Sequence, residues 1–139
     1  MTEIYDHNRK AGNEGDICKH LGLIAAVGET VAHTGDSPFK YADIFAGYAK
    51  NPLRGGCEWP QGIGLVAGPH LLSGNRHVAL WAECATLNKP PNLDGIYPRS
   101  AWFAREVRNR LGRPIELWLW ETASAPNNDL RTISGGSCL

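Results

Sequence analysis

Apolar residues recur with helical spacing in two stretches of this chain. An apolar stripe at positions i, i+3, i+4 and i+7 predicts a helix over 17–33, with Asp16 as its N-terminal cap. The segment 34–38 (TGDSP) ends this helix and places Gly35 at the usual C-terminal cap position. A second amphipathic helix is predicted over 100–111, with apolar residues on one side and arginines largely on the other. The apolar residues are Trp102, Phe103, Val107 and Leu111, and the arginines are Arg105, Arg108 and Arg110.

Two further apolar runs have the length of β-strands. The first, 39–45 (FKYADIF), leads into a loop of small residues, and the second, 115–120 (IELWLW), is followed directly by Glu121. A strand, a crossover that contains a helix and another strand form a right-handed parallel unit. The two runs are therefore expected to pair in parallel.

The region between these strands shows little periodicity. Residues 51–74 are rich in glycine and proline, which predicts an irregular insertion, and a short helix is predicted over 76–87. Residues 122–139 contain no further strand pattern. These features predict one incomplete α/β domain of residues 1–139, with an insertion at about 50–95.

The 139 residues include 42% hydrophobic and 20% charged residues, and the formal net charge is zero. This balance argues against nucleic-acid binding through bulk charge, although local basic contacts remain open. No run of about 18 apolar residues and no signal-peptide pattern is present, so we expect no membrane association and a cytoplasmic location. The four cysteines form no C-x-x-C pair, so we expect reduced thiols and no metal site.

The residues that follow the two predicted strands have the chemistry of a nucleoside site. Ligands of open parallel sheets bind at the carboxyl ends of the strands. Gly47 lets the backbone approach a ligand closely, and the carboxylate of Glu121 suits the two hydroxyls of a ribose. A plain structural turn and a solvated strand end remain alternatives, because Ala49 stands where a second glycine would help.

The segment 5–20 (YDHNRKAGNEGDICKH) is strongly polar and precedes the first apolar run. Such a segment is either a solvated tail or a ligand-facing entrance to a helix. For Arg9 and Lys10, a phosphate contact and a solvated tail are both open. For Trp102, Trp118 and Trp120, core packing is favoured over base stacking.

The motif AGNEGDICKH at 11–20, preceded by Tyr5 and His7, resembles the N-terminus of the RlmJ family. These S-adenosylmethionine-dependent methyltransferases modify N6 of an adenine in 23S ribosomal RNA. Three further segments resemble the family's first strand and glycine loop, a later helix, and the second strand with its ribose-binding acid, in the same order. They are KYADIFAGYA at 40–49, GIYPRSAWFAREV at 95–107, and IELWLWE at 115–121 followed by NDLR at 128–131.

The resemblance implies a partial Rossmann-like class I methyltransferase fold that binds S-adenosylmethionine. It assigns five residues to the cofactor: Lys19 and His20 would face it, Gly47 would line its methionine end, Ser100 would hydrogen-bond near it, and Glu121 would hold the ribose hydroxyls. It also places Tyr5 near the substrate base and implies ribosomal RNA as a partner. Asn13 and Asp16 would shape the N-terminal segment.

Three departures from the family pattern bear on activity. Phe45 stands where the family has a cofactor-contacting histidine, and Ala49 replaces a loop glycine. The catalytic motif, an acid or asparagine followed by two prolines and an aromatic residue, does not occur. The segment 88–92 (NKPPN) has an intervening lysine, lacks the aromatic residue and precedes Glu121. We therefore assign no catalytic residue and expect no methyl transfer by this polypeptide alone.

Other functions remain open at this point. The chain could be a non-catalytic nucleotide-binding or interaction module, or half of a split enzyme whose partner chain completes the sheet. Two parallel strands make a poor sheet with open edges, which favours an oligomer or a partner chain. A dinucleotide-binding domain is a weaker alternative.

Overall fold

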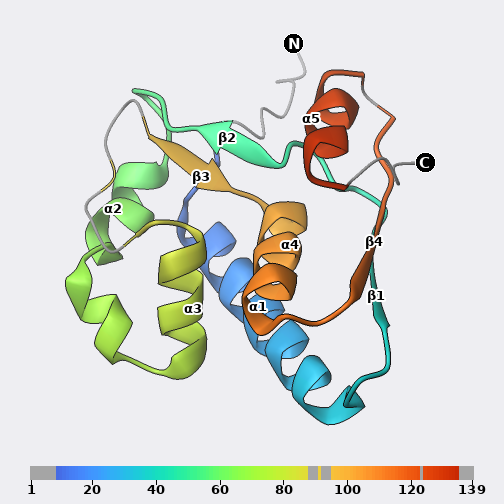
Figure 1. Ribbon diagram of the computed structural model, residues 1–139. Coiled ribbons are helices and arrows are strands. Elements are labelled where there is room, and N and C mark those ends of the chain that lie inside the picture. The colour runs from blue at the N-terminus through green and yellow to red at the C-terminus, as the bar shows by residue number, and fades with distance from the viewer. Residues whose placement is uncertain (1–8, 88–90, 92–94, 123, 135–139) are drawn as a thin grey trace.

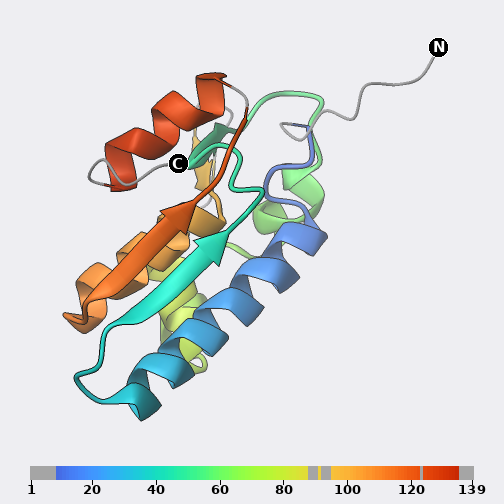
Figure 2. The ribbon, with the colours of Figure 1, turned by 90° about the vertical axis from the view of Figure 1, so that its right-hand side faces the viewer.

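The computed structural model describes residues 9–87, 91, 95–122 and 124–134. Its parallel pair consists of β1 (Phe39–Asp43) and β4 (Ile115–Leu119), as the sequence predicts. The register runs from Phe39 opposite Ile115 to Asp43 opposite Leu119. Helices α1 (Glu14–Thr34) and α4 (Ser100–Leu111) cover one face of this pair (Figure 1; Figure 2). The architecture is therefore mixed α/β.

Helix α1 begins earlier than expected, and Asn13 rather than Asp16 caps it. The Asn13 side-chain oxygen accepts the backbone N–H of Asp16 at 2.9 Å, while the Asp16 carboxylate accepts the N–H of Gly12 at 3.0 Å. Asp16 thus supports the turn before the helix. The expected end is confirmed, because Gly35 adopts a φ of 58° directly after Thr34.

Alternation along β4 decides which side chains enter the core. Ile115, Leu117 and Leu119 are buried beneath the helices, whereas Trp118 points outward and is 37% exposed. Core packing was therefore the wrong prediction for Trp118, and Trp102 and Trp120 are only half-buried.

In α4, the prediction for Leu111 is also wrong, because its side chain is exposed. Phe103 and Val107 are buried as expected. They are joined in the core by Ala101 and Ala104, whose small side chains leave room for α1 to lie close by.

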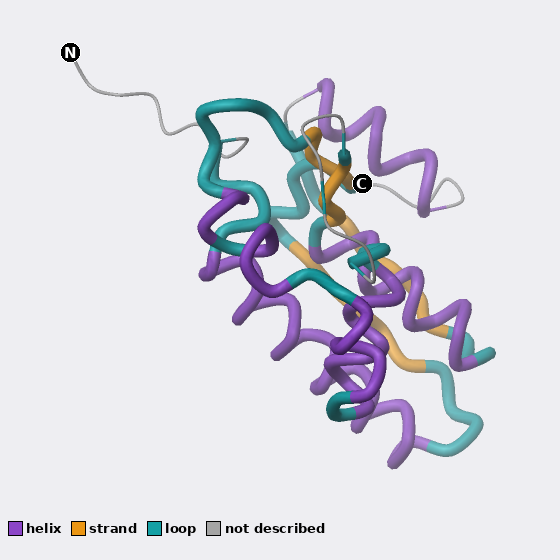
Figure 3. Tube along the Cα trace, turned by 90° about the vertical axis from the view of Figure 1, so that its left-hand side faces the viewer, coloured by secondary structure: helices purple, strands orange, loops and turns teal. Residues whose placement is uncertain are grey.

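The central insertion has more structure than its sequence suggests (Figure 3). Short strands β2 (Lys50–Pro52) and β3 (Ile96–Pro98) pair antiparallel. Four helical segments lie between these strands along the chain: η1 (Trp59–Gln61), α2 (Ile63–Val66), η2 (Pro69–Ser73) and α3 (Arg76–Cys84). The insertion is tied to the entrance of α1 by the N–H of Ile63, which donates to the carbonyl of Gly12 at 2.9 Å. Glycine is required at position 62, where an added Cβ would lie 2.1 Å from that carbonyl oxygen.

The chain after β4 forms helix α5 (Ser124–Ser134), which the sequence did not predict. The Leu130 side chain is buried, and the carboxylate of Asp129 accepts the N–H of Ala49 at 2.7 Å. Helix α5 therefore anchors the loop that follows β1. Among the described residues, no helix combines the length and apolar character needed to span a membrane.

Candidate functional site at the ends of the parallel strands

The carboxyl ends of β1 and β4 meet at one edge of the molecule, because the strands are parallel. The N-termini of α1 and α4 lie at the same end (Figure 2). Two backbone hydrogen bonds extend the pairing past the strands: Trp120 N–H to the carbonyl of Asp43 at 2.9 Å, and Ala46 N–H to the carbonyl of Trp120 at 3.2 Å. This extension brings the loop after β1 against Glu121.

Gly47 and Glu121 are in direct contact at this edge. The N–H of Gly47 donates to the Glu121 carboxylate at 3.0 Å, although 74 positions separate the two residues. Gly47 has a φ of 61°, which favours glycine, and apart from its chain neighbours no atom of the described residues lies within 4 Å of where its Cβ would be. The loop therefore presents a half-buried carboxylate and a backbone surface that opens to free space.

Asp43 organises the start of the same loop. Its carboxylate accepts the N–H of Phe45 at 3.0 Å and the hydroxyl of Tyr41 at 3.1 Å. Burial raises the pKa of Tyr41, and the negative charge of Asp43 raises it further, whereas a hydrogen bond with Ser100 acts in the opposite direction. Ser100 thus reaches the strand-end network through Tyr41 from the first turn of α4.

His20 lies in the core, and its side chain has 0% exposure. Its Nδ1 is 3.0 Å from the Tyr97 hydroxyl, and its ring centroid is 4.7 Å from that of Phe103. Burial, together with the positive charges of Lys19 and Arg99, lowers the pKa of His20 to about 3, and the negative charge of Asp16 partly opposes this shift. The imidazole is therefore neutral at physiological pH.

The tautomer of His20 follows from its neighbours. The Tyr97 hydroxyl oxygen accepts the indole N–H of Trp81 at 3.3 Å, so its own proton is available for His20 Nδ1. The hydrogen of His20 then sits on Nε2, which is buried and has no hydrogen-bond acceptor within the described part of the chain. The opposite tautomer would leave both this nitrogen and the Tyr97 proton without partners.

Lys19 is exposed, whereas the next residue, His20, is buried. The Lys19 ammonium lies 3.0 Å from the Asp16 carboxylate. Burial alone would raise the pKa of Asp16, but Lys19 and the N–H of Gly12 outweigh it and hold that pKa below its usual value. Lys19 therefore contributes positive charge to the first turns of α1, at the same end of the molecule as the strand ends.

The structure thus brings together some of the residues that the resemblance assigned to a cofactor. Gly47 contacts Glu121, and Ser100 joins the neighbouring network. A contact between His20 and a cofactor stays a prediction, and it would require the ring to leave the core. Tyr5 lies outside the described residues.

Sequence reasoning missed Asp43 and Asp129, which hold the two sides of the loop after β1. For Asp43 the signal was an acid just before a small-residue loop, and that pattern is common. Asp129 lies in the segment NDLR that carries part of the family resemblance, but no role was assigned to it. No group of three or more His, Cys, Asp or Glu side chains suited to a metal ion occurs in residues 9–87, 91, 95–122 and 124–134.

No model of a known protein family matches this sequence, and no curated protein matches it. Among solved structures, the chain is similar to protein LPL1258 from Legionella pneumophila, which carries the family model DUF519. The TM-score is 0.65 at 23% identity, over 86% of this chain and 43% of the Legionella chain. This likeness supports a shared fold, and the present chain spans less than half the length of that protein.

Proposed function

We propose that this chain is the S-adenosylmethionine-binding portion of a methyltransferase that resembles the RlmJ family. The observation that carries the proposal is the contact between Gly47 and Glu121 at the ends of adjacent parallel strands. Crevices at the carboxyl ends of parallel strands are the usual ligand sites of open α/β sheets. The four ordered sequence resemblances favour S-adenosylmethionine over a dinucleotide.

Each residue at the strand ends has a distinct part in binding. Glu121 would accept hydrogen bonds from ribose hydroxyls, and these would replace the one that it now accepts from the N–H of Gly47. Gly47 would admit the ligand next to the backbone, since no side chain of the described residues fills that space. The ammonium of Lys19 suits the carboxylate of the methionine moiety. S-adenosylmethionine would supply an activated methyl group.

Methyl transfer would need groups that this proposal does not assign to the chain. Adenine N6 methylation requires an acceptor for the amine hydrogens and an aromatic residue to stack on the base. Because the proline-proline-aromatic motif is absent from the sequence, we expect cofactor binding without turnover. Detection of methylated adenine after incubation of RNA with purified chain and S-adenosylmethionine would contradict this expectation.

Isothermal calorimetry with S-adenosylmethionine and with NAD tests the proposal. We expect Glu121→Gln to weaken S-adenosylmethionine binding by at least about tenfold, because the ribose hydroxyls lose a charged acceptor. Glu116→Gln is the matched control, since Glu116 lies on β4, the strand that leads to Glu121, and is exposed. Binding of NAD alone, or equal losses in both variants, would contradict the proposal.

A second candidate is a module whose sheet is completed by a partner chain. Ile44, Phe45 and Trp118 are exposed large apolar side chains on or just beyond the two parallel strands. Parallel sheets are usually covered on both faces, whereas the described helices cover only one (Figure 2). Native mass spectrometry distinguishes the candidates, because a monomer that binds S-adenosylmethionine favours a self-contained module.

A further inference from the structure

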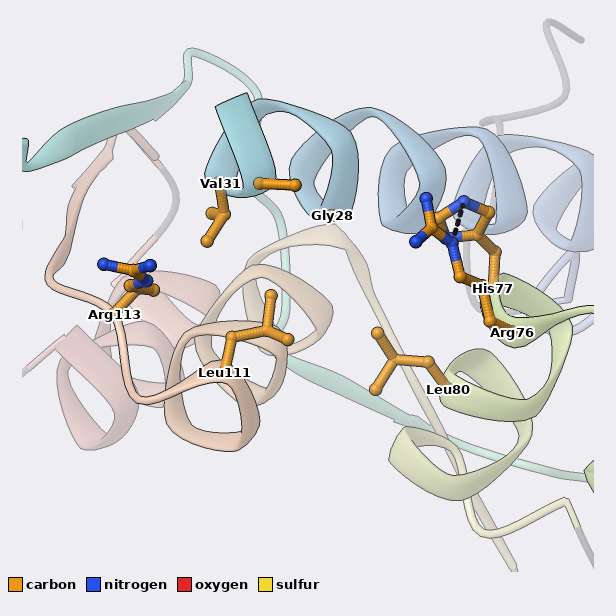
Figure 4. Close-up of a pocket in the computed structure, with 8 residues that line it drawn as sticks. Gly28, Val31, Arg76, His77, Leu80, Leu111 and Arg113 are labelled. Carbon is orange, nitrogen blue, oxygen red and sulfur yellow. Dashed lines mark hydrogen bonds between the residues drawn. The ribbon is translucent and has the colours of Figure 1, made fainter. Parts of the chain in front are cut away.

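A cavity lies away from the strand ends, between the C-terminal half of α1, the start of α3 and the end of α4 (Figure 4). Its volume is about 460 Å³, which is within the roughly 300–1,000 Å³ of small-molecule sites. It is lined by Gly28, Val31, Ala32, Arg76, His77, Leu80, Leu111 and Arg113. No residue of the proposed cofactor site contributes to it.

The middle of the cavity is apolar. Val31, Leu80 and Leu111 come from three different helices and point into the same space (Figure 4). Leu111 is one of the large apolar side chains that the fold leaves exposed. An apolar ligand segment would therefore remove an unfavourable contact with water here, without any change in the helix packing.

The charged groups of the cavity lie at its two ends. Arg76 and His77 stand at one end and Arg113 at the other, with the apolar side chains between them (Figure 4). The residues that line the cavity include no acid. Such an arrangement is complementary to a molecule with an apolar middle and a negative charge at each end.

Both arginines have acidic partners outside the lining. Arg76 pairs with Glu29, which His77 also contacts at 3.0 Å, and Arg113 pairs with Asp36. The Asp36 side chain is fully exposed, and surface ion pairs of this kind contribute little to stability. A ligand carboxylate beside the apolar wall would compete with these two acids for the same guanidinium groups.

We propose that this cavity binds a small linear dicarboxylate with an aliphatic middle. Guanidinium groups bind carboxylates through two parallel hydrogen bonds, and one such group stands at each end of the cavity. The proposal does not depend on the proposed cofactor site, because the two sites share no residue.

Backbone amide NMR titrations with three eight-carbon probes test the ligand chemistry. We expect octanedioate to bind more tightly than octanoate, and octanoate more tightly than octane-1,8-diol. Each carboxylate should increase the affinity by about fivefold or more. The amide signals of Gly28, Leu80 and Leu111 should shift. Binding of the diol as tight as that of octanedioate, or no shift at these positions up to the solubility limit, would overturn the proposal.

Single-site variants test the two charged ends. Arg113→Met and Arg76→Met should each weaken octanedioate binding by about fivefold or more. Octanoate has a single carboxylate, so only one of the two variants should weaken its binding. Arg110→Met is the matched control. Arg110 lies in the last turn of α4, close in sequence to Arg113, and pairs with Glu83 of α3 at 2.9 Å, but it does not line the cavity. Equal weakening by Arg110→Met would show a general charge effect and overturn the assignment. Glu121→Gln should leave octanedioate binding unchanged, which separates this test from that of the cofactor site.

Discussion

Two regions at the same end of the molecule received predicted site residues, and they differ in their access to solvent. The strand-end loop opens to free space at Gly47, whereas the cluster of His20, Tyr97 and Trp81 is closed on all sides. Lys19 and His20 are consecutive, yet one is exposed and the other is in the core. Successive residues of a helix point about 100° apart, so a polar sequence motif does not define a shared surface.

Polar groups serve different purposes in the two regions. In the loop, the carboxylate of Glu121 accepts a hydrogen bond from the backbone N–H of Gly47, and a ligand donor would replace that N–H. In the closed cluster, a hydroxyl links an imidazole and an indole from three elements, which fixes how α1, α3 and β3 pack. Perturbing the closed cluster should therefore cost stability, while perturbing the loop should chiefly affect binding.

Acid pH should produce the largest effect, through His20. Its pKa falls from 6.5 to about 3 on folding, so an unfolded chain takes up the proton first. The contribution to stability is complete above about pH 6.5 and is lost as the pH falls toward 3, by on the order of 4 kcal/mol. Urea unfolding measured between pH 7 and pH 3 should show this loss.

A comparison of variants separates the contribution of His20 to the pH dependence of the unfolding free energy from that of the carboxylates, which titrate in the same pH range. His20→Leu should have a shallower decline of unfolding free energy below pH 6.5 than the parent chain. His33→Gln serves as control, since His33 lies on the same helix and is exposed. If His20→Leu and the parent decline in parallel, the closed cluster does not hold a neutral imidazole.

Tyr97→Phe should have the next largest effect, a loss of about 2 kcal/mol at neutral pH. The variant keeps the ring in its packing but removes the hydroxyl that serves both His20 and Trp81, so two buried polar groups lose their partner. Thermal and urea unfolding measure the loss. Tyr41→Phe is a useful comparison, because Tyr41 is only half-buried and its hydroxyl bonds to Asp43. An equal loss in the two variants would argue against a special role for the closed cluster.

Local patterns predicted the elements that frame the strand-end site. Helix α4 and the parallel pair of β1 and β4 follow directly from periodicity and strand-length apolar runs. The cap at Asn13 was not predictable, since its amide also donates to Glu58, 45 positions away, at 2.8 Å. The pairing of β2 with β3 was missed because three-residue strands carry no usable alternation.

The site itself was predictable only where backbone topology controls it. Parallel strands force Gly47 and Glu121 toward one edge, so their contact could be expected from residue order alone. The burial of His20 depends on Tyr97, which lies 77 positions along the chain and belongs to β3. Nothing in the spacing of the N-terminal motif indicates such a partner.

Gly47→Ala should have the smallest effect on stability, about 1 kcal/mol, because alanine is strained at a φ of 61° but meets no atom in the open space. Its effect on S-adenosylmethionine affinity should be larger if the proposed site is correct, since the new methyl group would stand in the space that the proposal assigns to the ligand. Gly35→Ala provides the control: its φ is 58°, its surroundings are equally open, and it lies at the opposite end of α1. Both variants should lose similar stability in urea, and only Gly47→Ala should weaken binding by calorimetry. Similar affinities for the two variants would mean that the open loop is a structural turn, and the functional contrast between the two regions would be lost.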